Sequence, residues 1–187
     1  MGNGEFLGNQ LLIAMPALGD PNFHRTVTII CEHSEDGALG IIINRPTGMP
    51  LSHILEQLSL EAASPDIADQ PVLNGGPVQQ ERGFVLHEPG GEWDSTLEVS
   101  GEIRVTTSRD ILTAMANGTG PRRAIVALGY AGWEAGQLEA EIRANAWLSA
   151  PASSEIVFEL PFDQRWVAAT HLLGIDPAQL SGEAGHA

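Results

Sequence analysis

The most strongly patterned stretch of the chain reads LGYAGWEAGQLEAEIRANAWL and covers residues 128–148. It follows an apolar run at 124–127 that indicates a buried strand. Two glycines, Gly129 and Gly132, then lead into a helical pattern that starts near residue 133. We therefore predict a strand, a glycine turn and a helix, an arrangement that either presents backbone N–H groups to a ligand or simply reverses the chain.

The predicted helix at 133–148 has apolar side chains on two sides. Leu138 marks one side, and Trp133 and Trp147 mark the other, when successive residues are placed about 100° apart. A helix of this kind is covered on both sides. Asn145 falls beside Leu138, so we expect it to be buried and hydrogen-bonded, either to a neighbouring backbone or to a ligand.

Outside this stretch, short β-branched runs alternate with glycine- and proline-rich turns. Two of these runs flank Asp36-Gly37 and predict a hairpin, and a further turn is expected at 19–22. The combination of hairpins with a few helices indicates an α+β fold whose first half can curl into a small barrel. The predicted strands lie at 10–14, 26–31, 38–44, 71–73, 83–87, 97–99, 103–106, 122–128 and 155–160, and the predicted helices at 51–60, 108–116, 133–148 and 163–173.

Composition limits the class of protein. A length of 187 residues with 43% hydrophobic content fits a single domain over 1–187, with flexible ends at 1–9 and 181–187. The formal net charge is −15, and all nine basic residues are arginine. Such a chain repels phosphate backbones, which argues against direct nucleic-acid binding unless several arginines gather in one patch.

Targeting and cysteine signals are sparse. The apolar run at 11–18 has no basic leader and is too short to cross a bilayer. The single cysteine, Cys31, cannot form an intramolecular disulfide. We expect a cytoplasmic protein without a membrane span.

The sequence offers few parts for catalysis, a metal or a cofactor. Cys31 and His33 would lie roughly 6.5 Å apart along a strand, too far for a nucleophile and its base. An enzyme would need folding to bring His33 or His87 to Cys31 or Thr26. The six histidines lack metal-ligand spacing, and the glycine turns match neither a dinucleotide fingerprint nor a lysine-containing phosphate loop, so we expect no metal and no cofactor.

A set of polar residues at turns is more promising. Gathered into one cleft, its arginines would bind a carboxylate or phosphate through paired N–H groups. The alternative is that each arginine pairs with an Asp or Glu and holds a loop in place. The members of the set are Arg25, Asn44, Arg45, Gln79 and Arg82.

Several motifs together resemble the bacterial YqgE/AlgH family. They are the segments 19–23, 25–27, 31–33, 37–38, 44–46, 75–78, 82–87, 128–133, 136–139 and 145–148, together with Gly40, and then Trp166 and 173–176. The resemblance covers almost the whole chain in order. It implies an α+β fold with a branched, largely antiparallel sheet that includes a small barrel and is surrounded by helices. The resemblance also implies the label of transcriptional regulator, which describes an effect on a pathway. It implies no catalytic residues.

We therefore predict a non-catalytic regulatory or small-anion-binding protein, whose partner is an anionic ligand or another protein. Arg45 and Arg82 would anchor the anion, and Tyr130 or Trp133 would form an apolar wall. The alternatives are a transcriptional regulator, direct or indirect, and an enzyme that uses Cys31 or Thr26. The full candidate site is Arg25, Asn44, Arg45, Gly75, Gly76, Gln79, Arg82, Tyr130 and Trp133.

Overall fold

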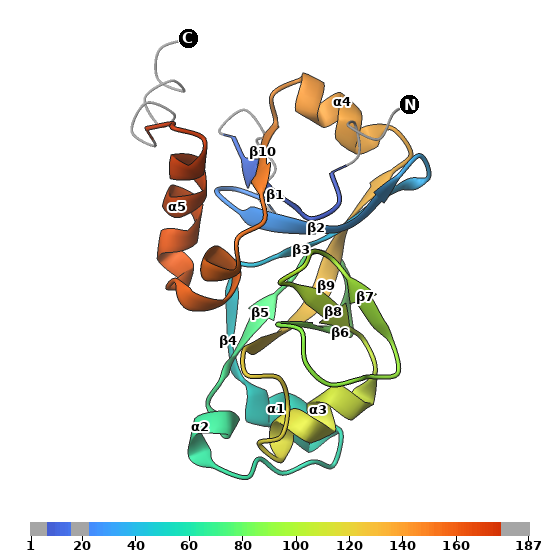
Figure 1. Cartoon of the computed structure of the whole chain (residues 1–187), viewed down its shortest axis with the longest axis vertical. Coiled ribbons are helices and arrows are strands. Elements are labelled where there is room, and N and C mark those ends of the chain that lie inside the picture. The colour runs from blue at the N-terminus through green and yellow to red at the C-terminus, as the bar shows by residue number, and fades with distance from the viewer. Residues whose placement is uncertain (1–6, 16–22, 177–187) are drawn as a thin grey trace.

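The computed structural model describes residues 7–15 and 23–176 (Figure 1). Its strands are β1 (Gln10–Ala14), β2 (Val27–Ser34), β3 (Gly37–Ile42), β4 (Pro46–Pro50), β5 (Pro71–Asn74), β6 (Val78–His87), β7 (Thr96–Glu98), β8 (Arg104–Thr106), β9 (Ala124–Glu134) and β10 (Trp147–Pro151). Its helices are α1 (Leu51–Gln57), α2 (Pro65–Ala68), α3 (Arg109–Ala116), α4 (Gln137–Arg143) and α5 (Arg165–Leu172), with a π-helical turn η3 (Glu155–Glu159) and a 3-10 turn η4 (Phe162–Gln164). The turn predicted at 19–22, residues 1–6 of the predicted flexible end at 1–9, and the predicted flexible end at 181–187 lie outside the described residues.

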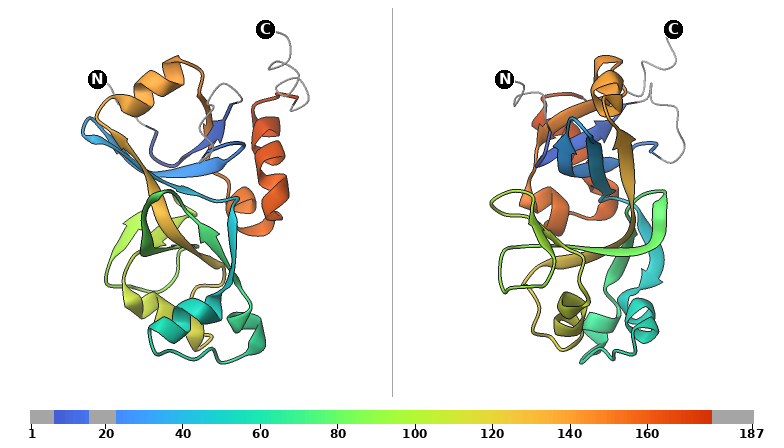
Figure 2. Two further views of the ribbon diagram at one scale, coloured as in Figure 1. Left: turned by 180° about the vertical axis from the view of Figure 1, so that it is seen from behind. Right: turned by 90° about the vertical axis from the view of Figure 1, so that its right-hand side faces the viewer.

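The sheet branches at β9. The C-terminal half of this strand pairs with β3, while its N-terminal half pairs with β6 on one side and with β5 on the other. The pairing with β5 is parallel, and the other pairings among the described strands are antiparallel. The path β10-β1-β2-β3-β9-β6-β8-β7 forms an open upper half and a lower half-barrel, with helices around both (Figures 1 and 2). The predicted α+β architecture, with its branched and largely antiparallel sheet, is confirmed.

Alternation along β9 divides its side chains among three hydrophobic cores. Ile125 and Ala127 join the main core beneath α5, and Val126 points to the opposite core, which α1 and α3 cover. Farther along the strand, Trp133 enters a third core under α4. The two-residue period of a strand therefore lets one element contribute to all three cores of the described residues.

The prediction of a helix over 133–148 was wrong at both ends. The strand continues through Gly129 and Gly132 to Glu134, and the helix α4 covers only 137–143. Trp147 lies in β10, and its ring meets that of Trp133 edge-on with centroids 5.8 Å apart. The two tryptophan rings meet because β9 and β10 both contribute side chains to the core under α4.

Two further details of the C-terminal third differ from prediction. Asn145 is exposed and has a φ of 62°, a left-handed conformation that follows the end of α4. Residues 155–160, predicted as a strand, contain the π-helical turn η3 instead. The neighbours Ile156 and Val157 are both buried, which a strand with one covered face does not allow.

Glycines permit β9 to cross the chain between β5 and β6 at close range. Gly129 has a φ of 81°, and a Cβ atom added there would lie 2.5 Å from the carbonyl oxygen of Gly76. Gly76, with a φ of 155°, packs equally close against the backbone of Tyr130. Any side chain at this crossing would push the half-barrel away from the strand on which it depends.

We predict that Gly129→Ala destabilises the protein far more than Gly48→Ala. Gly48 has a φ of 82° but faces open space, so alanine there costs about 1–2 kcal/mol of left-handed strain. Alanine at Gly129 adds the steric overlap, and we expect a total of about 3 kcal/mol or more in the free energy of unfolding. Urea unfolding of both variants checks this, and equal losses would contradict the close crossing.

Candidate functional site

The sequence-predicted residues around Asn44 hold the chain that leads into β2. The Asn44 side-chain oxygen accepts a hydrogen bond from the Val27 amide at 2.9 Å, and its Nδ2 donates to the Arg25 carbonyl at 3.0 Å. The Arg45 guanidinium donates to the His24 carbonyl at 3.0 Å. The Arg25 guanidinium lies over the Trp166 ring, 4.3 Å from its centroid. These contacts describe a structural joint between β2, β4 and α5.

Arg82 and Tyr130 meet at a different place, around Phe84. The Arg82 guanidinium lies 5.2 Å from the Phe84 ring centroid, and the Tyr130 ring approaches Phe84 edge-on at 5.8 Å. Gln79 is exposed nearby on β6 with a φ of 47°. Trp133 is buried and donates its indole N–H to Glu141 at 2.9 Å.

The contacts therefore place the set in two groups, with Gly75 and Gly76 at the crossing of β9. Tyr130 and Trp133 line a hollow of about 530 Å³ whose charged residues are Glu32, Asp36 and Glu134. An anion there would meet carboxylates. Anion binding by this set of residues stays a prediction.

A cleft of about 740 Å³ lies where the half-barrel meets the C-terminal segment. Its walls come from the α2–β5 connection, the loop before β9, and the segment from η3 to the start of α5. Unlike the acidic hollow, it gathers three of the nine arginines of the chain. It is lined by Ile67, Gln70, Pro71, Met115, Gly118, Gly120, Pro121, Arg122, Arg123, Ala124, Ile125, Phe158, Glu159, Leu160, Pro161, Phe162 and Arg165.

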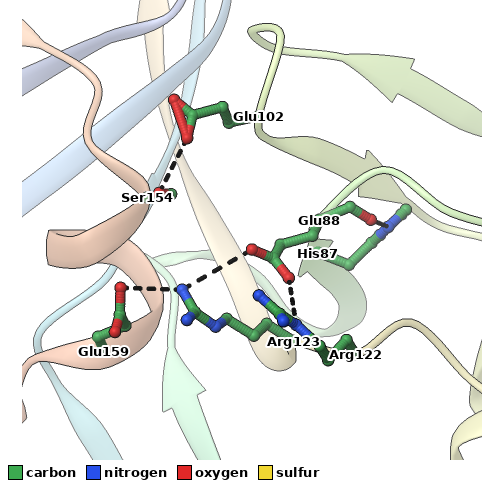
Figure 3. Close-up of polar contacts among 7 residues, drawn as sticks. All are labelled: His87, Glu88, Glu102, Arg122, Arg123, Ser154 and Glu159. Atoms are coloured by element: carbon green, nitrogen blue, oxygen red, sulfur yellow. Dashed lines mark hydrogen bonds and ion pairs between the residues drawn. The ribbon is translucent and has the colours of Figure 1, made fainter.

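Two of these arginines take part in ion pairs, one of which, Arg123–Glu159, joins two walls of the cleft (Figure 3). The Arg123 guanidinium lies 2.9 Å from Glu159 of η3 and 3.7 Å from Glu88, which follows β6. Arg122 lies 3.5 Å from the other oxygen of Glu88, and its side chain is 79% exposed. The carboxylates therefore neutralise most of the charge of this pair.

The third arginine, Arg165, is only 2% exposed and has no carboxylate within 4.0 Å among the described residues. Its Nε donates to the Leu160 carbonyl at 3.0 Å, and Nη1 donates to the Ile43 carbonyl at 2.7 Å. Its guanidinium lies 4.6 Å from the Phe162 ring centroid. Burial lowers the pKa of Arg165 to about 10, so the group remains charged at neutral pH. In the described parts of the chain, Nη2 has no hydrogen-bond acceptor.

The parts considered for an enzyme are engaged elsewhere. Cys31 is 5% exposed, its thiol lies 3.9 Å from the Ile29 carbonyl, and burial together with the Glu32 charge raises its pKa to about 12. The Thr26 hydroxyl donates to the Phe23 carbonyl at 2.8 Å. A neutral thiol is a poor nucleophile, so Cys31 lacks the activation that catalysis requires.

His87 belongs to a buried chain of hydrogen bonds beside β8. Its Nδ1 lies 2.8 Å from the Glu88 carbonyl, which can only accept, so this nitrogen carries the proton. Its Nε2 then accepts from the Thr106 hydroxyl at 2.7 Å, and Thr106 accepts from Thr96 at 2.8 Å. The arrangement satisfies a neutral imidazole. Burial is the main cause that lowers the pKa of His87, and the nearby Arg104 charge adds to it.

The family is settled by comparison with known proteins. The family model described as AlgH-like matches residues 11–178. A UPF0301 protein of Nitrosococcus oceani is 55% identical over 182 residues, 97% of each chain, and one of Thioalkalivibrio sulfidiphilus is 58% identical over 179 residues, 96% of each. The chain belongs to the AlgH-like family.

Solved structures agree with this placement. The solution structure of the AlgH protein from Pseudomonas aeruginosa matches with a TM-score of 0.80 at 51% identity, over 97% of this chain and 96% of that one. A crystal structure from Corynebacterium diphtheriae matches with a TM-score of 0.70 at 20% identity, which shows the fold alone. In the described part of this AlgH-like chain, no helix is long and apolar enough to span a membrane, and no three His, Cys, Asp or Glu residues gather as a metal site would need.

The three arginines of the cleft are not among the site residues predicted from the sequence. Arg122 and Arg123 form a basic doublet directly before the most apolar strand, a local signal that could have drawn attention. Arg165 precedes Trp166 at the start of a helix, and nothing in its neighbours indicates burial. Its environment comes from Ile43 and Leu160, which only the fold brings to it.

We predict that His87 makes stability depend on pH. Its pKa is lower in the folded state than the ordinary value of 6.5, so the unfolded chain binds the proton more tightly. The contribution is fully present above about pH 6.5 and is lost as the pH falls through the folded-state pKa. Urea unfolding should show a steeper acid loss for the wild type than for His87→Gln, which itself costs about 1 kcal/mol at pH 8. His171→Gln, at an exposed site on α5, serves as the control, and identical pH profiles for all three proteins would refute this role.

Proposed function

We propose that this AlgH-like protein is a non-catalytic, cytoplasmic regulatory protein that binds a small organic anion in the cleft between the half-barrel and α5. One observation carries the proposal, namely the buried, charged Arg165 without a carboxylate partner among the described residues. Buried charges in proteins are normally paired, because leaving one unpaired costs several kcal/mol. A bound anion would supply the missing partner.

The local charge supports the same proposal. Three guanidinium groups line the cleft, and Glu159 in its lining and Glu88 beside it offset Arg122 and Arg123, which leaves one positive charge in a chain of net charge −15. Low dielectric around Arg165 strengthens its attraction for an anion relative to an exposed arginine. The acidic remainder of the protein makes this cleft a distinct target for a negatively charged ligand.

The lining of the cleft favours binding over chemistry. Among the described residues that line it there is no Ser, Thr, Cys or His, the usual nucleophiles and bases of hydrolases and transferases. Its one carboxylate, Glu159, is held by Arg123 at 2.9 Å. These features support a binding role, in which ligand occupancy alters how the C-terminal segment sits on the half-barrel.

We predict that organic anions stabilise the protein through Arg165. Benzoate or phenyl phosphate at ten times its Kd should raise the free energy of unfolding by about 1.4 kcal/mol, while neutral benzamide should have no such effect. Thermal melts measure this, and the anion effect should vanish in Arg165→Met. Arg143→Gln makes the same charge change on α4 and should keep the effect.

Arg165→Met also leaves the Leu160 and Ile43 carbonyls without their donor, so circular dichroism must first show that the variant is folded. Arg165→Lys keeps the charge and provides a second, milder variant, for which a weakened anion effect is expected. An anion-induced shift of equal size in wild type, Arg165→Met and Arg165→Lys would overturn the proposal.

A further inference from the structure

We infer that the ligand of this cleft is a monocarboxylate with a hydrophobic body, an inference that rests on the proposed function and specifies its ligand class. Three properties of the cleft lead to it: the amount of uncompensated charge, the number of free donors, and the composition of the walls.

The uncompensated charge matches a single negative charge. Arg123 is shared between Glu159 and Glu88, and Arg122 also faces Glu88. Of the three arginines that line the cleft, only Arg165 has no carboxylate within 4.0 Å among the described residues. A phosphate monoester carries nearly two negative charges at neutral pH, so its second charge would meet Glu159 instead of a free arginine. A carboxylate carries one charge and balances the site.

The free donors point the same way. Two of the three guanidinium nitrogens of Arg165 are used by the Leu160 and Ile43 carbonyls, which leaves Nη2 as the nitrogen without an acceptor in the described ranges. Such a nitrogen can donate to a carboxylate oxygen. A phosphate group presents three strong acceptor oxygens and is normally held by more donors than this.

The walls suit an apolar body. Phe158, Leu160 and Phe162 form the side given by the C-terminal segment, and Ile67 and Met115 face them from the helices of the half-barrel. The volume of about 740 Å³ falls within the range of pockets that hold whole organic ligands, far above the need of acetate or inorganic phosphate. Because the Arg165 guanidinium lies on the Phe162 ring, the acid group would sit at that end, and the body would extend toward α2 and α3.

Titration calorimetry with a matched series of straight-chain compounds tests the class. We expect affinity to rise roughly three- to four-fold for each CH₂ group from butanoate to octanoate, as apolar surface is buried. Octanoate should bind at least roughly ten-fold tighter than 1-octanol, octylamine or octyl phosphate, because only octanoate offers one charge and an apolar tail. In Arg165→Lys the affinity for octanoate should fall while the gain per CH₂ group stays.

Glu159→Gln provides an independent variant that leaves Arg165 and its anchoring bonds in place. Removing this carboxylate frees Arg123 for a second charge, so octyl phosphate should bind roughly two- to five-fold tighter than it does to the wild type. Glu155→Gln, an exposed residue of the same π-helical turn, is the matched control and should leave both affinities unchanged.

The outcomes separate this inference from the proposed function. Octyl phosphate binding tighter than octanoate, with both depending on Arg165, would overturn the carboxylate class and keep anion binding. Equal affinity for octanoate and octanol, unchanged in Arg165→Lys, would overturn both. Affinity that does not rise with chain length would refute the hydrophobic body.

Discussion

Both halves of the sheet depend on one strand, β9, whose hydrogen bonds join β3 above to β5 and β6 below. This sharing is possible because Gly129 and Gly76 let two backbones pass where a Cβ atom would not fit. The strand also contributes side chains to all three hydrophobic cores, so the packing of the upper sheet and the half-barrel is coupled through it. β9 therefore holds the two halves of the domain together, and the outer elements attach to β9 and to the strands that pair with it.

The C-terminal segment from Ser154 to Arg165 is one of these outer elements, and polar contacts join it to the rest of the domain. Arg165 bonds the Ile43 carbonyl after β3, Glu159 pairs with Arg123 at the start of β9, and Ser154 donates to Glu102 of the β7–β8 turn at 3.1 Å (Figure 3). An anion bound in the cleft would pair with Arg165, which itself bonds this segment to the rest of the domain. Binding and the docking of this segment are therefore expected to be linked, which gives a regulatory protein its means of response.

The fold could be predicted from sequence more completely than the cleft. Runs of β-branched and apolar residues between glycine-containing turns correctly predicted β1, the β2–β3 hairpin and the β7–β8 pair, because these signals are local in the sequence. The helix predicted over 133–148 failed because Trp133 and Trp147 also fit a helical repeat, and only the tertiary pairing of β9 and β10 separates the alternatives. Arg165 could not be predicted as a site residue for a related reason. Its burial and its lack of a carboxylate arise from residues up to 122 positions away in the chain, and no local pattern reports such a separation.

The central claim is that Arg165 holds an uncompensated positive charge that receives an acid group. A proton–nitrogen correlation spectrum of the arginine Nε–H groups tests this directly, because the Arg165 Nε–H is bonded to Leu160 and shielded from exchange. During titration with octanoate we expect a saturable shift of the Arg165 signal, with the Arg143 signal unmoved. A titration in which only the exposed Arg122 signal shifts, or in which every arginine shifts alike without saturation, would contradict the account.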